Sequence, residues 1–309
     1  MKHLISIADL SSEELWHILN RARQLKDEWR SGGNRPILKG KVMGMIFQKP
    51  SLRTRISFDV AMLQLGGQAL YISPDEIRLG ERESVPDVAR VLSRYVDVIM
   101  ARVFSHQHIV DLATYSRVPV INGLSDYSHP CQGIADMFTI WEKLGYLKGV
   151  KLTYVGDANN VAVSLLFAAT KLGMDFTIAH PPGYGLPAEV LRRAEEFARG
   201  SGSRITVTHD PVAAVRGAQV VYTDVWTSMG QEAEKAEREA VFPPYQVNIA
   251  LLSHARPDAI VMHCLPAHRG QEITDEVADS SHSALFDQAE NRLHAQKGIL
   301  AFLMVDQVA

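Results

Sequence analysis

The chain has 309 residues, 46% of them hydrophobic, and a formal net charge of -3. This length is enough for two α/β domains with their own cores, and the composition excludes a disordered chain. The balance of 32 basic and 35 acidic residues argues against a nucleic-acid-binding surface. We expect no membrane attachment, because no uncharged run reaches the roughly 20 residues that span a bilayer and no signal-peptide pattern is present. The only two cysteines lie in polar motifs, which argues against a disulfide framework and favours the cytoplasm.

Strands and helices are predicted to alternate along the chain. A capping box at Ser11 to Glu14 precedes a helix of about five turns. Four strands are predicted at 42–47, 68–72, 97–102 and 118–121, with helices near 53–65, 86–95, 106–115 and 132–144. A second series of strands is predicted at 151–156, 175–180, 204–208, 219–223 and 259–263. This order predicts an α/β fold with two doubly wound lobes, each a parallel sheet with helices on both faces.

The boundary between the two lobes is predicted in segment 144–149. The predicted domains are therefore 1–146, completed by a C-terminal helix within 283–309, and 147–282. The C-terminal helix lies past the last strand of the second sheet and carries the charged patch Glu290-Asn291-Arg292. We expect this helix to pack back on the first lobe.

An anion-binding motif is predicted at Lys49-Pro50-Ser51-Leu52-Arg53-Thr54-Arg55, where an apolar strand passes into a helix. The unpaired amides of the helix start and the Ser51 and Thr54 hydroxyls can point at one anion. The guanidinium of Arg53 matches phosphate oxygens in pairs. The alternative is that Ser51 only caps the helix and the arginines are solvated.

Further polar motifs follow the predicted strands, at the edge of an open α/β sheet where ligands bind. They are Arg102, His129 to Gln132, Asp157 to Asn160, Asp224 to Gly230, and His263 to Leu265. A buried Arg102 needs an anionic partner, either a carboxylate or a ligand. His129 could donate to a carbonyl oxygen that gains negative charge, or could simply cap a helix.

The second lobe lacks the fingerprint of a dinucleotide-binding protein. Gly156 is the only glycine where that fingerprint requires three, which disfavours a nucleotide-dependent oxidoreductase. Asparagines at this strand end suit an amino-acid ligand, since an amide can donate to a carboxylate and accept from an ammonium. Asp224 could hold a cationic amine under a lid formed by the Ser-Met-Gly loop. The charged run 231–239 is predicted to be a solvated helix.

Cys264 could be a nucleophile, a metal ligand or a substrate contact. Its neighbour His263 points to the opposite face of the strand, which disfavours a nucleophilic pair. The two residues form no tetrahedral ligand spacing with another Cys or His cluster, so no metal site is predicted.

Taken in order, these motifs resemble the aspartate and ornithine carbamoyltransferase family over essentially the whole chain. The resemblance rests on Ser51-Leu52-Arg53-Thr54-Arg55, Arg102, His129-Pro130-Cys131-Gln132, Asp224 to Gly230, and His263-Cys264-Leu265-Pro266. The last two motifs are similar to the ornithine-specific branch. The resemblance thus implies carbamoyl transfer from carbamoyl phosphate to the δ-amine of L-ornithine, giving citrulline for arginine biosynthesis.

The resemblance also implies a role for each domain and for particular residues. Domain 1–146 would bind carbamoyl phosphate and domain 147–282 would bind ornithine. The implied carbamoyl phosphate ligands are Ser51, Leu52, Arg53, Thr54, Arg78, Arg102, His129, Pro130, Cys131, Gln132, Cys264, Leu265 and Arg292. The implied ornithine ligands are Asn160, Asp224, Ser228 and Met229. The implied catalytic residues are Arg102, His129 and Cys264.

No metal ion or organic cofactor is implied, and the implied partners are the two substrates and further copies of the chain, as a homotrimer or a multiple of trimers.

Two residues depart from the family pattern. Leu52 stands where Thr is usual. Arg78, in a loop that family members lend to a neighbouring subunit, stands where Gln or His is common.

The alternative functions are a transferase for putrescine or an N-acylornithine, and a non-catalytic ligand-binding paralogue. Asp224 and the Ser-Met-Gly loop argue against the first, and retention of the whole motif set argues against the second. A catabolic direction stays open.

Overall fold

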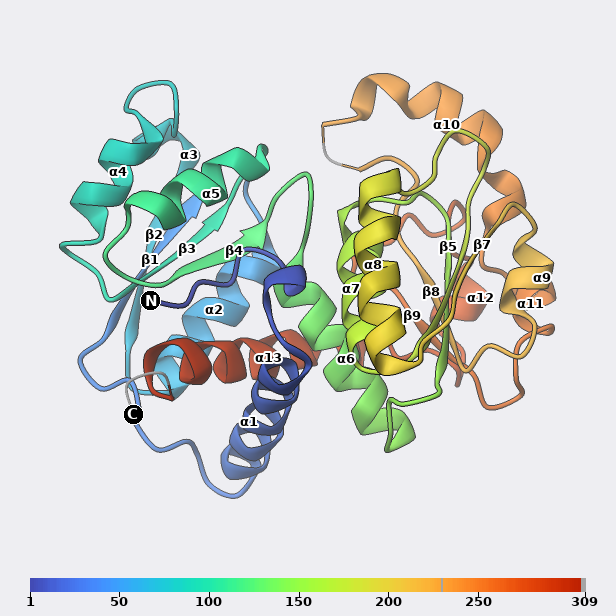
Figure 1. The fold of residues 1–309 in the computed structure, drawn as a ribbon, viewed down its shortest axis with the longest axis horizontal. Helices are drawn as coiled ribbons and strands as arrows, with labels where there is room; N and C mark the ends of the chain where they lie inside the picture. The colour runs from blue at the N-terminus through green and yellow to red at the C-terminus, as the bar shows by residue number, and fades with distance from the viewer. Residues whose placement is uncertain (229, 307–309) are drawn as a thin grey trace. The chain divides into compact units, whose positions relative to one another are not determined.

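The computed structural model describes residues 1–228 and 230–306 (Figure 1). The chain forms two compact units: the first combines Met1–Phe138 with the chain from Glu290 onward, and the second is Thr139–Ala289. Helices α6 (Pro130–Leu144) and α13 (Leu285–Met304) therefore contribute turns to both units. The boundaries predicted from the sequence fall near the ends of these helices, because composition indicates where a helix stops and not which neighbours each turn contacts.

The first unit is built on a four-stranded parallel sheet with the order β2-β1-β3-β4. Its strands are β1 (Val42–Phe47), β2 (Gln68–Ile72), β3 (Val98–Arg102) and β4 (Val120–Leu124). The chain moves from β1 to one neighbour and then returns to the other side, so the winding direction reverses between β1 and β3. Loops that follow these two strands diverge there, which creates the usual ligand position of an open α/β sheet.

Helices lie on both sides of this sheet (Figure 1). They are η1 (Ile7–Asp9), α1 (Ser12–Arg30), α2 (Leu52–Gln64), α3 (Pro74–Ile77), α4 (Val85–Leu92), α5 (His106–Tyr115), and the parts of α6 and α13 named above. Helices α4 and α5 pack on one side through a buried apolar cluster that includes Val88, Ile99 and Leu112. Helices α1, α2 and α13 lie on the other side.

The second unit holds a five-stranded parallel sheet with the order β7-β6-β5-β8-β9. Its strands are β5 (Lys151–Val155), β6 (Asp175–Ala179), β7 (Ile205–Thr208), β8 (Val220–Thr223) and β9 (Ile260–Met262). Its helices are α7 (Asn160–Lys171), α8 (Ala188–Ser201), α9 (Pro211–Val215), η2 (Glu232–Glu234), α10 (Lys235–Val241), η3 (Pro243–Tyr245), α11 (Ile249–Leu252) and α12 (Asp275–Ala278). The winding reverses between β5 and β8. The predicted α/β fold with two doubly wound lobes is confirmed.

The C-terminal helix packs on the first unit, as predicted. It crosses α1 closely, because a Cβ added to Gly298 would lie only 2.6 Å from the Ile18 carbonyl oxygen. Any side chain larger than hydrogen would force the two helices apart at this crossing. One residue earlier, the buried Lys297 donates to Asn34 Oδ1 at 2.7 Å and lies over the Trp29 ring.

The buried Lys297 makes a contribution to stability that should increase at alkaline pH. Burial lowers its pKa from 10.5 to about 8. Between these two values the unfolded chain binds more protons than the folded chain, so the free energy of unfolding rises with pH. We expect this contribution to amount to about 1–2 kcal/mol from pH ~8 to pH ~10, obtained by urea denaturation as the difference between the protein and Lys297→Met. Cys131 acts in the opposite direction in both proteins, because its raised pKa lowers the free energy of unfolding above pH ~9. The same pH dependence in both proteins would contradict this assignment.

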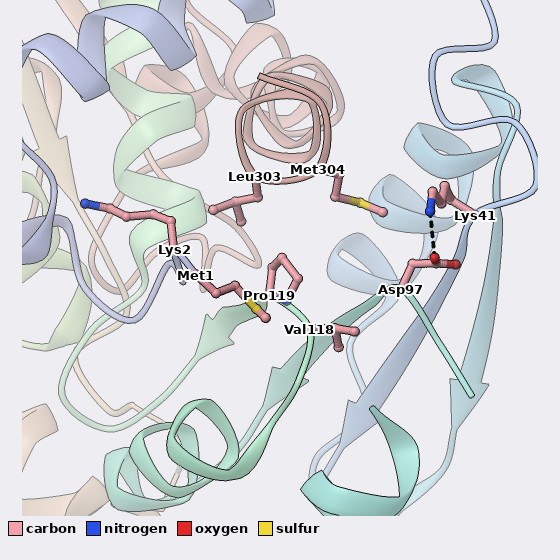
Figure 2. Close-up of a pocket in the computed structure, with 8 residues that line it drawn as sticks. All are labelled: Met1, Lys2, Lys41, Asp97, Val118, Pro119, Leu303 and Met304. Atoms are coloured by element: carbon pink, nitrogen blue, oxygen red, sulfur yellow. Dashed lines mark hydrogen bonds and ion pairs between the residues drawn. The ribbon is translucent and has the colours of Figure 1, made fainter. Parts of the chain in front are cut away.

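A cavity of about 610 Å³ lies at the amino ends of the strands of the first sheet, opposite the carboxyl ends where Ser51 and Arg102 lie (Figure 2). Its walls come from the starts of β1, β3 and β4 and from the end of α13, and Lys41 pairs with Asp97 at 2.9 Å on one side. None of the predicted site residues lines it. Within the described part of the chain, no helix is both long and apolar enough to cross a membrane.

Candidate active site

The first cluster of site residues surrounds the start of α2, directly after β1. Ser51 caps the helix: its Oγ accepts from the Thr54 amide at 3.4 Å and donates to Thr54 Oγ1 at 3.1 Å. Arg53 is half-buried at the second helical position. The free amides of this first turn and the positive end of the helix dipole favour an anion here.

Leu52 takes part in this cluster only through its backbone. It is the first residue of α2, and its side chain is 75% exposed. A side chain facing solvent adds no ligand atom, whereas its amide belongs to the free first turn. The presence of Leu52 in place of the usual Thr therefore changes the exposed surface of α2 more than it changes the predicted anion-binding position.

Arg102 and His129 add a buried basic pair to the cluster. Arg102 ends β3, beside Phe47 of β1, and is only 8% exposed. His129 precedes α6 and is 3% exposed. Burial, together with the charges of Arg292 and Arg102, holds the pKa of His129 well below its usual value. The imidazole is therefore neutral at pH 7, a form in which one ring nitrogen donates a hydrogen bond.

Arg292 ties α13 to both other helices of the cluster. Its Nη1 donates to Gln132 Oε1 at 2.6 Å and its Nη2 donates to Thr54 Oγ1 at 2.8 Å. Gln132 is held in turn by Asp136, to which its amide donates at 2.8 Å. Residues separated by 238 positions in the sequence thus meet in one buried network.

Cys131 and Arg78 stand apart from these contacts in the described chain. The Cys131 thiol donates to the Asn122 carbonyl at 3.4 Å, and burial raises its pKa to about 12. Pro130, Cys131 and Gln132 are the first three residues of α6. Arg78 is exposed and caps α3 in a left-handed conformation with φ 38°.

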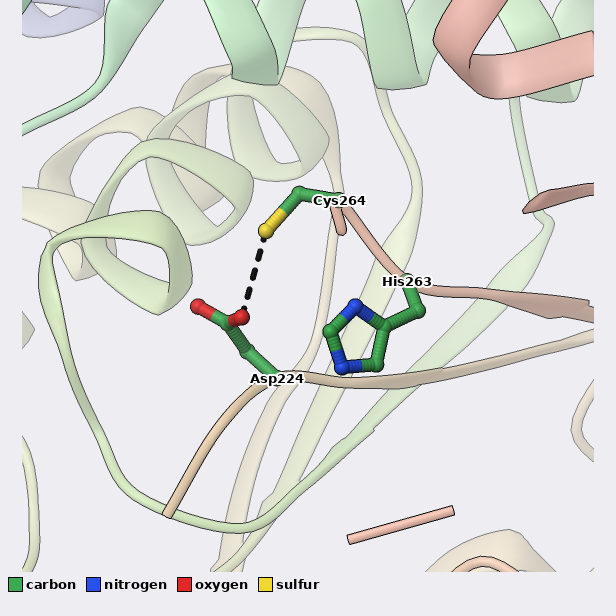
Figure 3. Close-up of side chains that lie close together, drawn as sticks. All are labelled: Asp224, His263 and Cys264. Carbon is green, nitrogen blue, oxygen red and sulfur yellow. Dashed lines mark hydrogen bonds between the residues drawn. The ribbon is translucent and has the colours of Figure 1, made fainter. Parts of the chain in front are cut away.

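The second cluster forms where β5, β8 and β9 end (Figure 3). Asp224, only 5% exposed, follows β8 and accepts from the Cys264 thiol at 3.2 Å. Leu265 adopts φ 60°, and its amide donates to His263 Nδ1 at 2.9 Å. Such a left-handed conformation is strained for leucine, so the surrounding contacts must hold it.

His263 supports the strand end from within the core. Its Nδ1 accepts from Leu265, so the proton lies on Nε2, which donates to Glu272 Oε1 at 3.0 Å. Both side chains are fully buried. Asp224, His263 and Cys264 lie close enough to hold a metal ion, but both His263 nitrogens are already engaged. This donor set is therefore a poor metal site.

Asn159 joins the second cluster, although sequence reasoning selected its neighbour Asn160. Its Oδ1 caps α7 by accepting from the Val161 and Ala162 amides. Its Nδ2 donates to Asp224 Oδ2 at 2.7 Å and to Ser228 Oγ at 3.3 Å. The signal for it was present in the sequence, because an Asn before an apolar helix is a preferred N-cap. Met229 lies outside the described residues.

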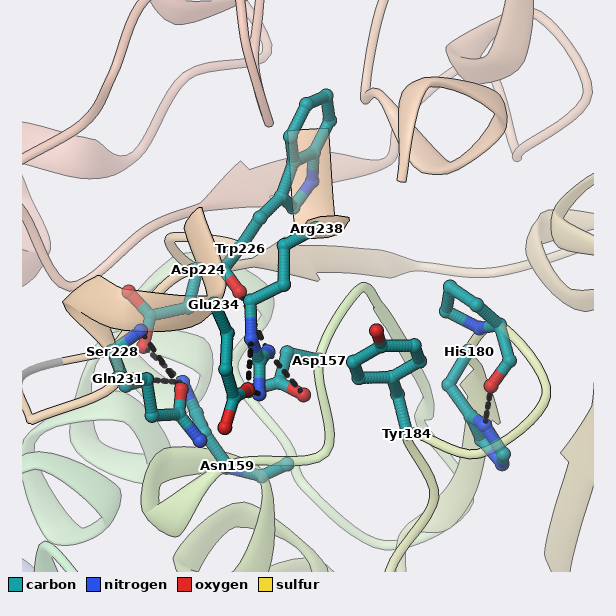
Figure 4. A network of polar contacts seen from close by, with 12 residues as sticks. Asp157, Asn159, His180, Tyr184, Asp224, Trp226, Ser228, Gln231, Glu234 and Arg238 are labelled. Atoms are coloured by element: carbon teal, nitrogen blue, oxygen red, sulfur yellow. Dashed lines mark hydrogen bonds and ion pairs between the residues drawn. The ribbon is translucent and has the colours of Figure 1, made fainter. Parts of the chain in front are cut away.

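A buried arginine that sequence reasoning missed holds the chain after β8 (Figure 4). Arg238 of α10 is 4% exposed, contacts Asp157 Oδ1 at 3.0 Å and donates to the Trp226 carbonyl at 2.8 Å. It also pairs with Glu234 and lies over the Tyr184 ring. The run 231–239 is thus not a uniformly solvated helix, because Arg238 of α10 is buried in its pair with Asp157. Burial raises the pKa of Asp157 to about 6 even beside Arg238.

Replacing Arg238 with glutamine is expected to lower the free energy of unfolding by about 3 kcal/mol, since Asp157 would remain buried without its partner. The loop that carries Ser228 would also lose its anchor. Chemical denaturation measures the first effect. The matched control is Lys235→Gln on the same helix, whose exposed pair with Glu239 at 3.7 Å should contribute less than about 0.5 kcal/mol. Equal losses in the two variants would contradict a special role for Arg238.

Comparison with known proteins identifies the family. Residues 2–142 match the carbamoyl-P binding domain of aspartate/ornithine carbamoyltransferase, and residues 148–303 match its Asp/Orn binding domain. The chain belongs to the aspartate/ornithine carbamoyltransferase family, as the sequence motifs predicted.

Individual members of this family that resemble the chain are ornithine carbamoyltransferases. The anabolic ornithine carbamoyltransferase of Pyrococcus furiosus is 56% identical over 98% of this chain and 96% of its own length. A solved structure of ornithine carbamoyltransferase from Pyrococcus furiosus matches 98% of this chain and 97% of its own with a TM-score of 0.96. The anabolic ornithine carbamoyltransferase structure from Campylobacter jejuni is 38% identical and covers all of both chains with a TM-score of 0.94.

Proposed function

We propose that the chain transfers the carbamoyl group of carbamoyl phosphate to the δ-amine of L-ornithine, giving L-citrulline and phosphate in arginine biosynthesis. The observation that best supports this proposal is the group of side-chain contacts around Asp224. Asp224 joins Asn159, Ser228 and Cys264 through side-chain contacts, either directly or through Asn159. A buried carboxylate beside an amide and a hydroxyl suits the ammonium of an α-amino acid. Full-length relatives named ornithine carbamoyltransferase support the same substrate.

The first cluster suits carbamoyl phosphate. Arg53 and the amides of α2 would bind the phosphate oxygens, and Arg292 would approach the same ligand from α13. Arg102 and the neutral His129 would donate to the carbonyl oxygen. The neutral δ-amine attacks the carbonyl carbon, and negative charge gathers on that oxygen in the tetrahedral intermediate. The C–O bond to phosphate then breaks, phosphate leaves with its electron pair, and the proton lost by the amine nitrogen ends on the departing phosphate.

Preorganised donors are the main source of rate enhancement in this scheme. Removing a single donor of this kind typically reduces kcat by about 10²–10³. Because His129 is kept neutral by burial and neighbouring guanidiniums, it acts as a hydrogen-bond donor and not as an imidazolium acid. Cys264 and Leu265 would lie beside the reacting nitrogen at the end of β9.

The assembly and the location belong to the same proposal. We infer a homotrimer or a multiple of trimers, in the cytoplasm. The outer face of α2 supports self-association, since Leu52, Ile56 and Leu63 are 75%, 47% and 70% exposed. Exposed apolar side chains at helical spacing are typical of a subunit interface. Arg78 would then act on a neighbouring subunit's ligand. Light scattering of the purified protein tests the assembly, and a monomer would refute it.

The decisive experiment offers several amines to one enzyme preparation. Purified protein is incubated with carbamoyl phosphate and, separately, with ornithine, putrescine, N-acetylornithine or aspartate. Phosphate release and the carbamoylated product are both measured. We expect citrulline from ornithine and little product from the others, which lack a free α-amino acid group or the δ-amine. Reaction with another amine alone would refute the specificity, and no product from any amine would favour a ligand-binding paralogue.

A further inference from the structure

The motif Glu290-Asn291-Arg292 divides into two functions in the structure. Arg292 faces the first cluster through Thr54 and Gln132. The two residues before it face α1 instead, where Lys26 donates to Asn291 Oδ1 at 2.7 Å and lies 3.4 Å from Glu290 Oε1. Adjacent residues on a helix point about 100° apart, so one turn of α13 connects to both neighbours.

Lys26 is buried in a way that a surface lysine is not. It is 2% exposed, and its ammonium lies 5.6 Å from the centre of the Phe138 ring. Burying a lysine is unfavourable unless the charge is paired and hydrogen-bonded. Glu290 supplies the charge, and it also meets Arg30 at 3.6 Å and His294 at 3.5 Å.

We propose that Lys26 is a positioning residue for carbamoyl phosphate binding, acting through Arg292. Its bond to Asn291 fixes the rotation of α13 at the turn that carries Arg292, and the close crossing at Gly298 fixes the separation of the same two helices. The guanidinium is thereby held where it meets Thr54 and Gln132. A binding group displaced by about 1 Å loses most of its contribution, so its support has to be rigid. The proposal rests on the role of Arg292 in the proposed function.

The test is a double-mutant cycle with Lys26→Met and Arg292→Gln. Methionine keeps the length and apolar stem of lysine, and Glu290, which pairs with Lys26, is half exposed and also pairs with Arg30 and His294. We expect Lys26→Met to raise KM for carbamoyl phosphate and Ki for inorganic phosphate about tenfold, with KM for ornithine changed less than about twofold. In the Arg292→Gln background, Lys26→Met should add less than about twofold.

Lys297→Met is the matched control. It also removes a buried lysine that joins α13 to the N-terminal segment, but its partner is Asn34 and it lies more than one turn beyond Arg292. We expect no change in KM for carbamoyl phosphate. Asn291→Leu, which removes the acceptor and keeps Lys26, should reproduce the Lys26→Met effect and serves if that variant does not fold.

The outcomes distinguish the proposed binding role of Arg292 from the proposed positioning role of Lys26. If Arg292→Gln leaves KM and Ki unchanged, the proposed role of Arg292 fails. If Arg292→Gln raises them but Lys26→Met and Asn291→Leu do not, only the positioning role fails. Equal effects of Lys26→Met in both backgrounds, or equal effects of Lys26→Met and Lys297→Met, would show general loosening of the helix and overturn the proposal.

Discussion

Replacing Arg53 with alanine is expected to reduce kcat/KM for carbamoyl phosphate by about 10²–10³ while the protein stays folded. Arg53 is half-buried in the first turn of α2, where the free amides already favour an anion. Its loss removes a paired contact to the phosphate at the point where the leaving group gains charge. Steady-state kinetics of citrulline formation and inhibition by inorganic phosphate measure the effect.

Arg55 provides a control two residues further along the same helix. Its guanidinium lies 4.2 Å from the centre of the Tyr71 ring, and its side chain is exposed. Arg55→Ala removes the same charge from the same region, so long-range electrostatics alone would affect both variants equally. We expect Arg55→Ala to change kcat/KM less than about threefold. Similar losses in the two variants would show that net charge, and not a specific contact, explains the Arg53 effect.

The second large effect is expected at Asp224. In Asp224→Asn, KM for ornithine should rise about 100-fold, because a neutral amide replaces the carboxylate that would pair with the substrate ammonium. Asn159 and Cys264 would also lose their charged acceptor. KM for carbamoyl phosphate should stay nearly constant, since the ligands proposed for that substrate on the first unit are unchanged. Kinetics with each substrate varied in turn separate the two constants.

Asp258→Asn is the matched control in the same unit. Asp258 is an exposed carboxylate that pairs with Arg256 at 2.8 Å. We expect its replacement to leave both KM values unchanged and to alter stability by less than about 1 kcal/mol. If Asp224→Asn behaves like this control, Asp224 does not bind the amino acid and the proposed orientation of ornithine is wrong.

Most strands were predictable because they are short apolar runs, and several of them end at a polar motif. Differences occur at ends where a backbone conformation overrides the pattern. The predicted strand 259–263 ends early, at Met262, where the chain turns toward the left-handed Leu265. The predicted strand 118–121 instead runs to Leu124, across a register shift beside Arg102. Such backbone departures depend on neighbours that a local pattern does not contain.

The candidate site was predictable only in part, for a similar reason. Strand-end motifs gave Ser51, Arg53, Arg102, His129 and Asp224 because chemistry and position coincide in the sequence. The burial of Arg238 was not predicted, because a charged run on a short helix looks solvated unless its partner, which follows β5, is known. The partner, Asp157, is 81 positions away in the sequence, beyond the reach of helical periodicity.

The different surroundings of the two cysteines make the protein suitable for labelling as it stands. Cys131 is buried, with its pKa raised to about 12, so its reactive thiolate form is scarce at neutral pH. Cys264 is half-buried at the end of the strand that would hold the attacking amine. A thiol reagent should therefore modify one position in the folded chain. The rate of that modification would report occupancy of the second cluster by any ligand, including one that does not react.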